Sequence, residues 1–195
     1  MPRIIRASKL GDAAILKELI KILAENKIRV IKSNFYNPEL TLSKGNFTKI
    51  KPQKIDLINI RKGIKSLKSL SAHNHVQGLI IRNNFVIAKE TSKGTKKMIL
   101  SIKKSKKTKA FLIKFPKKKQ DVRADLPTVG LDTLKDCKKV NIGGIMLKAN
   151  QNILSFAMMF QQLVSILLCA SLRTTILCNG LRCCHSQQSE DVLQH

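Results

Sequence analysis

The chain has 195 residues, of which 43% are hydrophobic, so it can form one domain with a buried core, and wholesale disorder is not expected. Its formal net charge is +25, which favours partners that carry phosphate, such as nucleic acid, anionic lipid or a nucleotide. Aromatic residues make up only 4%, which argues against single-stranded nucleic acid held by base stacking. Most cations are scattered lysines, as an AT-rich genome places them at tolerant surface positions, so charge alone does not establish such a partner.

The first expected elements are a helix, a strand and a second helix. Apolar residues recur at three- and four-residue spacing over residues 13–26, which predicts an amphipathic helix with Asp12 as its N-cap. Residues 28–32 predict a short strand. The apolar spacing over residues 53–71 predicts a second amphipathic helix.

A β-hairpin is expected next. Residues 78–82 and 85–89 are rich in β-forming side chains and flank Asn83-Asn84, a pair that tolerates the left-handed conformation of a two-residue turn. The remaining expected elements are a helix over residues 95–104, a strand over 110–115 ended by Pro116, a helix over 131–139 and a strand over 144–148. This alternation predicts an α/β domain, a layered mixed sheet with flanking helices.

A change in composition divides the chain near its end. All 29 lysines lie between Lys9 and Lys148, and four of the five cysteines follow them. We therefore expect a domain over residues 1–155 and an atypical tail, helical or disordered, over residues 156–195. Residues 153–172 approach the length of a membrane span but carry two glutamines at the middle, so a membrane span, a packed or peripheral helix and an out-of-frame peptide all remain open.

The loop expected after the strand at 110–115 is dense in charge. Lys117 and Arg123 are suited to phosphate oxygens, and Asp121 and Asp125 are hard oxygen donors of the kind that Mg²⁺ prefers. In α/β sheets, ligands tend to bind at this carboxyl end of a strand. The competing interpretation is a solvated charged loop.

Five short motifs occur in a fixed order along residues 4–155. The most specific is Gln-Asp-x-Arg-x-Asp-Leu-Pro-Thr-Val-Gly at residues 120–130. The others are Leu10-Gly11-Asp12, Gln77 followed by an apolar hairpin and Ala88-x-Glu90, Gly94-Thr95 with Met98, and Asn141-Ile-Gly143-Gly144-Ile145. Together they resemble the C-terminal domain of the UDP-2,3-diacylglucosamine pyrophosphatases of bacterial lipid A biosynthesis.

The resemblance implies a metal-dependent hydrolase that cleaves UDP-2,3-diacylglucosamine to UMP and 2,3-diacylglucosamine 1-phosphate, with Mg²⁺ or Mn²⁺ as cofactor. It implies catalytic roles for Glu90, Asp121 and Asp125, and a metal-binding role for Asp125. The residues that it implies for substrate binding are Gln77, Gly94, Thr95, Lys117, Gln120, Arg123 and Thr128.

Two departures from the family pattern fall in its Glu-Gly-Thr-Asp loop. Lys93 stands where the family has Glu, and Lys96 stands where it has Asp. An ammonium group has no acceptor lone pair and repels a divalent cation, so we expect an inactive copy. The family's N-terminal domain has no counterpart before Met1, so we also expect a truncated copy, with a separately encoded N-terminal domain as a candidate partner.

The expected ligand is therefore a UDP-diacylglucosamine-like lipid nucleotide. The alternative is a basic protein that binds nucleic acid or an anionic surface through the lysines of residues 103–109 and 117–119, without base specificity. The odd number of cysteines and the lack of an apolar run of signal length near Met1 indicate a cytoplasmic protein. Peripheral contact with the inner membrane remains open.

Overall fold

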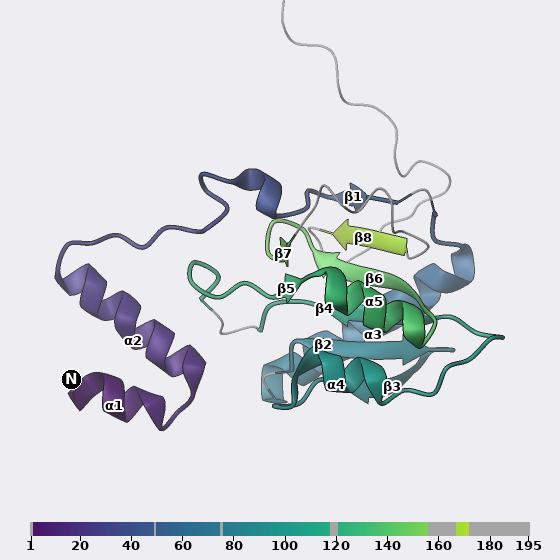
Figure 1. The fold of residues 1–195 in the computed structure, drawn as a ribbon, viewed down its shortest axis with the longest axis horizontal. Helices are drawn as coiled ribbons and strands as arrows, with labels where there is room; N and C mark the ends of the chain where they lie inside the picture. Colours follow the sequence, from purple (N-terminus) through teal and green to yellow (C-terminus); the bar gives the residue numbers. More distant parts are fainter. Residues whose placement is uncertain (1, 49, 75, 118–120, 156–166, 172–195) are drawn as a thin grey trace, which may run out of the picture.

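A six-stranded mixed sheet forms the centre of the computed structural model, which describes residues 2–48, 50–74, 76–117, 121–155 and 167–171 (Figure 1). The strand order is β1-β8-β6-β4-β2-β3, and β5 and β7 form a separate pair. The strands are β1 (Gly45–Asn46), β2 (Gly78–Arg82), β3 (Phe85–Lys89), β4 (Ala110–Lys114), β5 (Thr128–Val129), β6 (Ile142–Lys148), β7 (Ile153–Leu154) and β8 (Leu167–Ser171). The α-helices are α1 (Pro2–Ser8), α2 (Asp12–Glu25), α3 (Lys54–Asn74), α4 (Gly94–Leu100) and α5 (Leu131–Lys139), with a 3₁₀ turn at Pro38–Leu40. The α/β class expected from the sequence is confirmed.

The sheet topology brings three chain segments to one edge. β4 and β6 run parallel, with α5 in the connection between them, and β2 runs antiparallel to β4. As a result Gly78, the first residue of β2, pairs with Lys114, the last residue of β4. Lys89, the last residue of β3, pairs with Leu79 on the other side of β2. Residues that follow β3 and β4 therefore meet at this edge.

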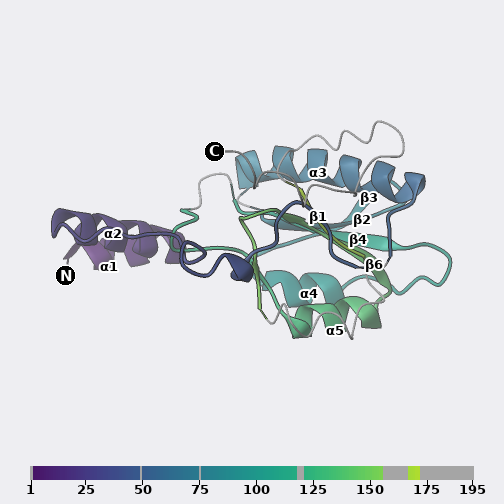
Figure 2. The same cartoon turned by 90° about the horizontal axis from the view of Figure 1, so that it is seen from above.

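Helices cover both faces of the sheet (Figure 2). α3 lies on one face, and α4 and α5 lie on the other, as the two hydrophobic clusters also show. β4 is buried along its whole length, which explains why its sequence is a continuous apolar run rather than an alternating one. The core is built mainly from Ile, Leu, Val and Met, with a few Ala and Phe residues and Cys137.

Close packing of α3 on the sheet depends on Gly63. A Cβ at this position would clash with Ile113 Cδ1 and lie 3.1 Å from Ile81 Cγ2, and both isoleucines are fully buried. We expect Gly63→Ala to lower the free energy of unfolding by about 2 kcal/mol, because overpacking at this fully buried contact costs about 3 kcal/mol and the higher helix propensity of alanine offsets roughly 1 kcal/mol of it. Urea denaturation measures the change. Lys65→Ala, on the exposed side of the same helix, is the control, and a Gly63→Ala variant as stable as that control would contradict the packing argument.

The hairpin is confirmed at the predicted residues. Asn83 and Asn84 adopt positive φ values of 49° and 65°, as a two-residue turn of the favoured twist requires. The pairing changes register within the hairpin: Ile80 pairs with Ala88, but Ile81 pairs with Val86. Residue 87 is therefore an extra residue, a β-bulge in the outermost strand.

One local prediction is wrong and two others are wrong in part. Residues 28–32 form no strand, because no neighbouring strand pairs with them; instead Ile28 N donates to Leu23 O at 2.8 Å and closes the end of α2. Asp12 is the first residue of α2 rather than its N-cap, which is Gly11. The helix expected over residues 95–104 ends at Leu100.

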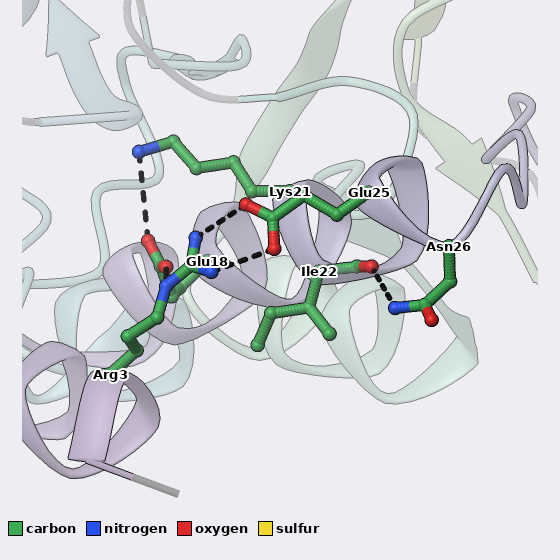
Figure 3. A network of polar contacts seen from close by, with 6 residues as sticks. All are labelled: Arg3, Glu18, Lys21, Ile22, Glu25 and Asn26. Atoms are coloured by element: carbon green, nitrogen blue, oxygen red, sulfur yellow. Dashed lines mark hydrogen bonds and ion pairs between the residues drawn. The ribbon is translucent and has the colours of Figure 1, made fainter.

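The first two helices form a pair beside the sheet domain, and α1 was not expected from the sequence. Arg3 of α1 joins two acidic residues of α2 (Figure 3): its Nε lies 2.6 Å from Glu18 Oε1, and its other nitrogens lie 2.7 and 2.8 Å from the carboxylate of Glu25. This contact lowers the pKa of Glu25. Asn26 closes α2 by donating to Ile22 O at 2.8 Å.

The tail is described only at residues 167–171, which form β8. This strand pairs in parallel with β6 and antiparallel with β1, so this part of the tail is extended rather than helical. The glutamine-containing middle of the expected span and residues 172–195 lie outside the described residues. None of the described helices is both long and apolar enough to cross a membrane.

Candidate functional site

A buried lysine marks the edge of the sheet where β4 ends. The Lys114 ammonium lies 3.4 Å from Glu90 Oε1 and also donates to the hydroxyl of Thr95, which in turn donates to Glu90 Oε1. The side chains of Lys114 and Glu90 are each only 7% exposed. Burial of such a pair is tolerated because each charge has an opposite charge and a hydroxyl beside it.

Backbone contacts hold Glu90 in this place. Its N–H donates to Gly78 O at 2.9 Å, which continues the β2–β3 pairing by one residue. A Cβ on Gly78 would lie only 2.8 Å from Glu90 Oε2, so the carboxylate fills the space that a larger residue would need. The sequence of β2 thus begins with glycine because the carboxylate packs against its backbone.

Two acceptor atoms at this edge have no hydrogen-bond partner among the described residues. Gln77 Oε1 and Glu90 Oε2 are both buried, and unpaired buried acceptors are uncommon in folded proteins. Gln77 directly precedes β2, and its backbone oxygen accepts from Phe115 N at 2.9 Å. The two atoms therefore lie on segments that the backbone joins.

A second group of charges lies in the loop after β4. Arg123 Nη2 is 2.7 Å from Asp121 Oδ2, and both Arg123 Nε and Arg123 N lie 3.0 Å from Asp121 Oδ1. These bonds from Arg123 lower the pKa of Asp121, and the charge of Lys17 on α2 adds a smaller effect in the same direction. The carboxylate is thus ionised and already bound on both oxygens.

The same loop is fixed at its far end by the segment after β6. Ile153 N and Asn152 Nδ2 donate to Pro127 O at 3.0 and 3.4 Å. Thr128 begins β5 and is exposed, and its hydroxyl donates to Leu126 O at 3.2 Å. The β5–β7 pair thus holds the far end of the loop.

The residues predicted from the sequence fall into these two groups. Gln77, Glu90, Gly94 and Thr95 lie around Lys114, whereas Lys117, Asp121, Arg123, Asp125 and Thr128 belong to the loop after β4. Within the described residues, no hydrogen bond or ion pair that involves the first four residues reaches Asp121, Arg123 or Asp125. Gln120 lies outside the described residues.

Sequence reasoning did not assign Lys114 to the site. The signal was present, because a lysine that ends a wholly buried apolar strand needs a nearby carboxylate. Which carboxylate it meets depends on the β2–β4 register, and this is a long-range property of the fold. Lys93 and Lys96, by contrast, are exposed on the turn that carries Thr95.

Among the residues that the structure describes, the predicted acids do not form a set that fits a divalent metal. In the described part of the chain, no three His, Cys, Asp or Glu residues come together in a group that could hold a metal ion. Glu90 is bound by Lys114, and Asp121 is bound by Arg123. Mg²⁺ and similar cations need several oxygen ligands, and Asp125 is the only predicted acidic residue without such a described ion pair.

Comparison with known proteins identifies relatives of the domain. The family model described as the LpxI C-terminal domain matches residues 43–164. UDP-2,3-diacylglucosamine pyrophosphatase LpxI of Caulobacter vibrioides is 24% identical over 159 residues, which cover 77% of this chain and 57% of the relative. The matched region thus spans little more than half the length of that relative.

Proposed function

The chain belongs to the family of LpxI C-terminal domains, and from this premise we propose that it binds a UDP-linked diacylglucosamine at the edge where β4 ends without cleaving it. The ligand class follows from the name of the Caulobacter relative, a UDP-2,3-diacylglucosamine pyrophosphatase. The diphosphate of such a ligand would meet Lys93 and Lys96 at this edge, and the resemblance implies that Arg123, in the loop after β4, also binds it.

The observation that carries the proposal is the state of the carboxylates. Hydrolysis of a pyrophosphate needs a group that holds a metal or activates water. Glu90 and Asp121 are each bound by a cation, which leaves Asp125 as the one predicted acid without a described ion pair. Lysines occupy positions 93 and 96, where the resemblance implies acids. A bound diphosphate would therefore be neutralised but not attacked.

A hydrolysis assay on the full chain tests the proposal. With UDP-2,3-diacylglucosamine in detergent micelles and Mg²⁺ or Mn²⁺ present, we expect no UMP release above the protein-free blank, several orders of magnitude below an active metal-dependent hydrolase. Equilibrium binding of the same ligand is expected to be measurable. Replacing Arg123 by Met should weaken that binding, whereas Lys135→Met, an exposed change on α5, should not.

Two results would contradict the proposal. Metal-dependent UMP release would show that the chain is an active enzyme. Failure to bind the lipid nucleotide, together with DNA binding that disappears when residues 103–109 are neutralised, would favour the alternative of a basic polyanion-binding protein. The lysines of that loop, Lys103, Lys104, Lys106, Lys107 and Lys109, are all exposed.

A further inference from the structure

The edge that does not fit a divalent metal carries two exposed lysines. Lys93 and Lys96 flank Thr95, and Thr95 contacts the Lys114 ammonium. Both flanking lysines are exposed, and no carboxylate of the described chain forms an ion pair with either of them. The two lysines therefore lie on the segment that carries Thr95, and the Lys114–Glu90 pair does not neutralise them.

The carboxylates of Glu90 and Asp121 do not offset this charge. Glu90 Oε1 accepts from both Lys114 and Thr95, and Glu90 Oε2 is buried against Gly78. Asp121 accepts from Arg123 through both of its oxygens. Glu90 and Asp121 are thus each matched by one cation, and neither carboxylate forms an ion pair with Lys93 or Lys96 in the described part of the chain.

A diphosphate needs positive charge close to its oxygens, and two kinds of group supply it in proteins. Divalent metals do so when carboxylates hold them, and lysine or arginine side chains do so by charge-assisted hydrogen bonds. A lysine also repels a metal that would otherwise bridge the phosphates and a carboxylate. The two kinds of group are therefore alternatives at one position.

We propose that this edge binds a diphosphate without a divalent metal, with Lys93 and Lys96 supplying the counter-charge. The inference rests on the proposed function for its ligand class. It differs from that function in predicting the sign of the metal effect: Mg²⁺ competes with the protein for the diphosphate and so weakens binding.

Titration calorimetry on the full chain tests this sign, with inorganic pyrophosphate and UDP as probes. In EDTA both probes are expected to bind, and excess Mg²⁺ is expected to lower their affinity several-fold. The double variant Lys93→Met/Lys96→Met should lower the affinity in EDTA at least tenfold. The matched control is Lys106→Met/Lys107→Met, which removes the same charge from the exposed loop before β4 and should change the affinity less than twofold.

Exchange of the two lysines for acids tests whether their positive charge is required for diphosphate binding. Lys93→Glu/Lys96→Asp should abolish binding in EDTA, because two positive charges near Thr95 become negative and the net charge falls by four units. Circular dichroism and a thermal melt would show whether each variant keeps the wild-type fold, and only folded variants are compared.

Each remaining outcome decides the question. Binding of either probe only when Mg²⁺ is present would overturn the metal-free inference and leave the proposed function standing. An equal loss of affinity in the Lys106→Met/Lys107→Met control would show nonspecific attraction and overturn it too. No binding of either probe, with or without Mg²⁺, would refute the proposed function together with the inference.

Discussion

Lys114→Met is expected to lower the free energy of unfolding by about 3–5 kcal/mol, because it leaves the Glu90 carboxylate buried without its cation. Both side chains are 7% exposed, so water cannot replace the lost contact. The loss is a large part of the total stability of an ordinary domain, about 5–15 kcal/mol. Urea denaturation followed by circular dichroism measures it.

Two companions of this variant separate charge from packing. Lys114→Met/Glu90→Met removes both charges and should recover most of the stability, since apolar pairs of similar volume often replace buried ion pairs without loss. Lys135→Met breaks an exposed 3.9 Å pair with Asp132 and should cost less than about 0.5 kcal/mol. A Lys114→Met variant as stable as the Lys135→Met control would contradict the conclusion that the buried Glu90 carboxylate depends on Lys114.

Alkylation of Cys137 in the folded protein is expected to be about a thousandfold slower at pH 8 than in the unfolded chain, because only the thiolate reacts. Burial raises the pKa of this thiol to about 12, and the neighbouring Asp136 carboxylate adds to the shift. Cys137 is 0% exposed on the inner side of α5, which also excludes the reagent.

The experiment is a timed iodoacetamide reaction with peptide mass spectrometry, and the same cysteine in concentrated urea is the reference. An alkylation rate for folded Cys137 within tenfold of its rate in urea would contradict the burial of this side of α5. The sign for stability follows from the raised pKa: the unfolded thiol ionises first, so the stability that this group contributes is lost as the pH rises from about 9 towards 12.

The elements predicted well from the sequence are those specified by neighbouring residues. The hairpin around Asn83-Asn84 and the helix Leu131–Lys139 are found at the predicted residues because a turn signal and a helical apolar spacing act locally. Residues 28–32 failed because β-rich composition makes a strand only where another strand accepts its hydrogen bonds. β8 was missed for the converse reason, since its partners, β6 and β1, are distant in the chain.

The candidate site shows the same division. Motif order placed Glu90 and Thr95 in one site, and the structure brings them into contact. It did not reveal that Lys114 would neutralise Glu90, because that pairing depends on how β2, β3 and β4 align. The Asp121–Arg123 pair spans two residues, yet its formation depends on a loop conformation that no periodicity encodes.

The outer edge of β3 is poorly suited to pairing with strands from other molecules. β3 is the outermost strand, and Phe85 and Ile87 are 70% and 39% exposed there. An edge strand with exposed apolar side chains can pair with strands from other molecules. The extra residue at position 87 breaks the regular spacing of backbone donors and acceptors. Lys62 Nζ, 5.4 Å from the centre of the Phe85 ring, adds a charge that an incoming strand must desolvate. We therefore expect the domain to keep two apolar side chains on an edge strand without seeding fibres.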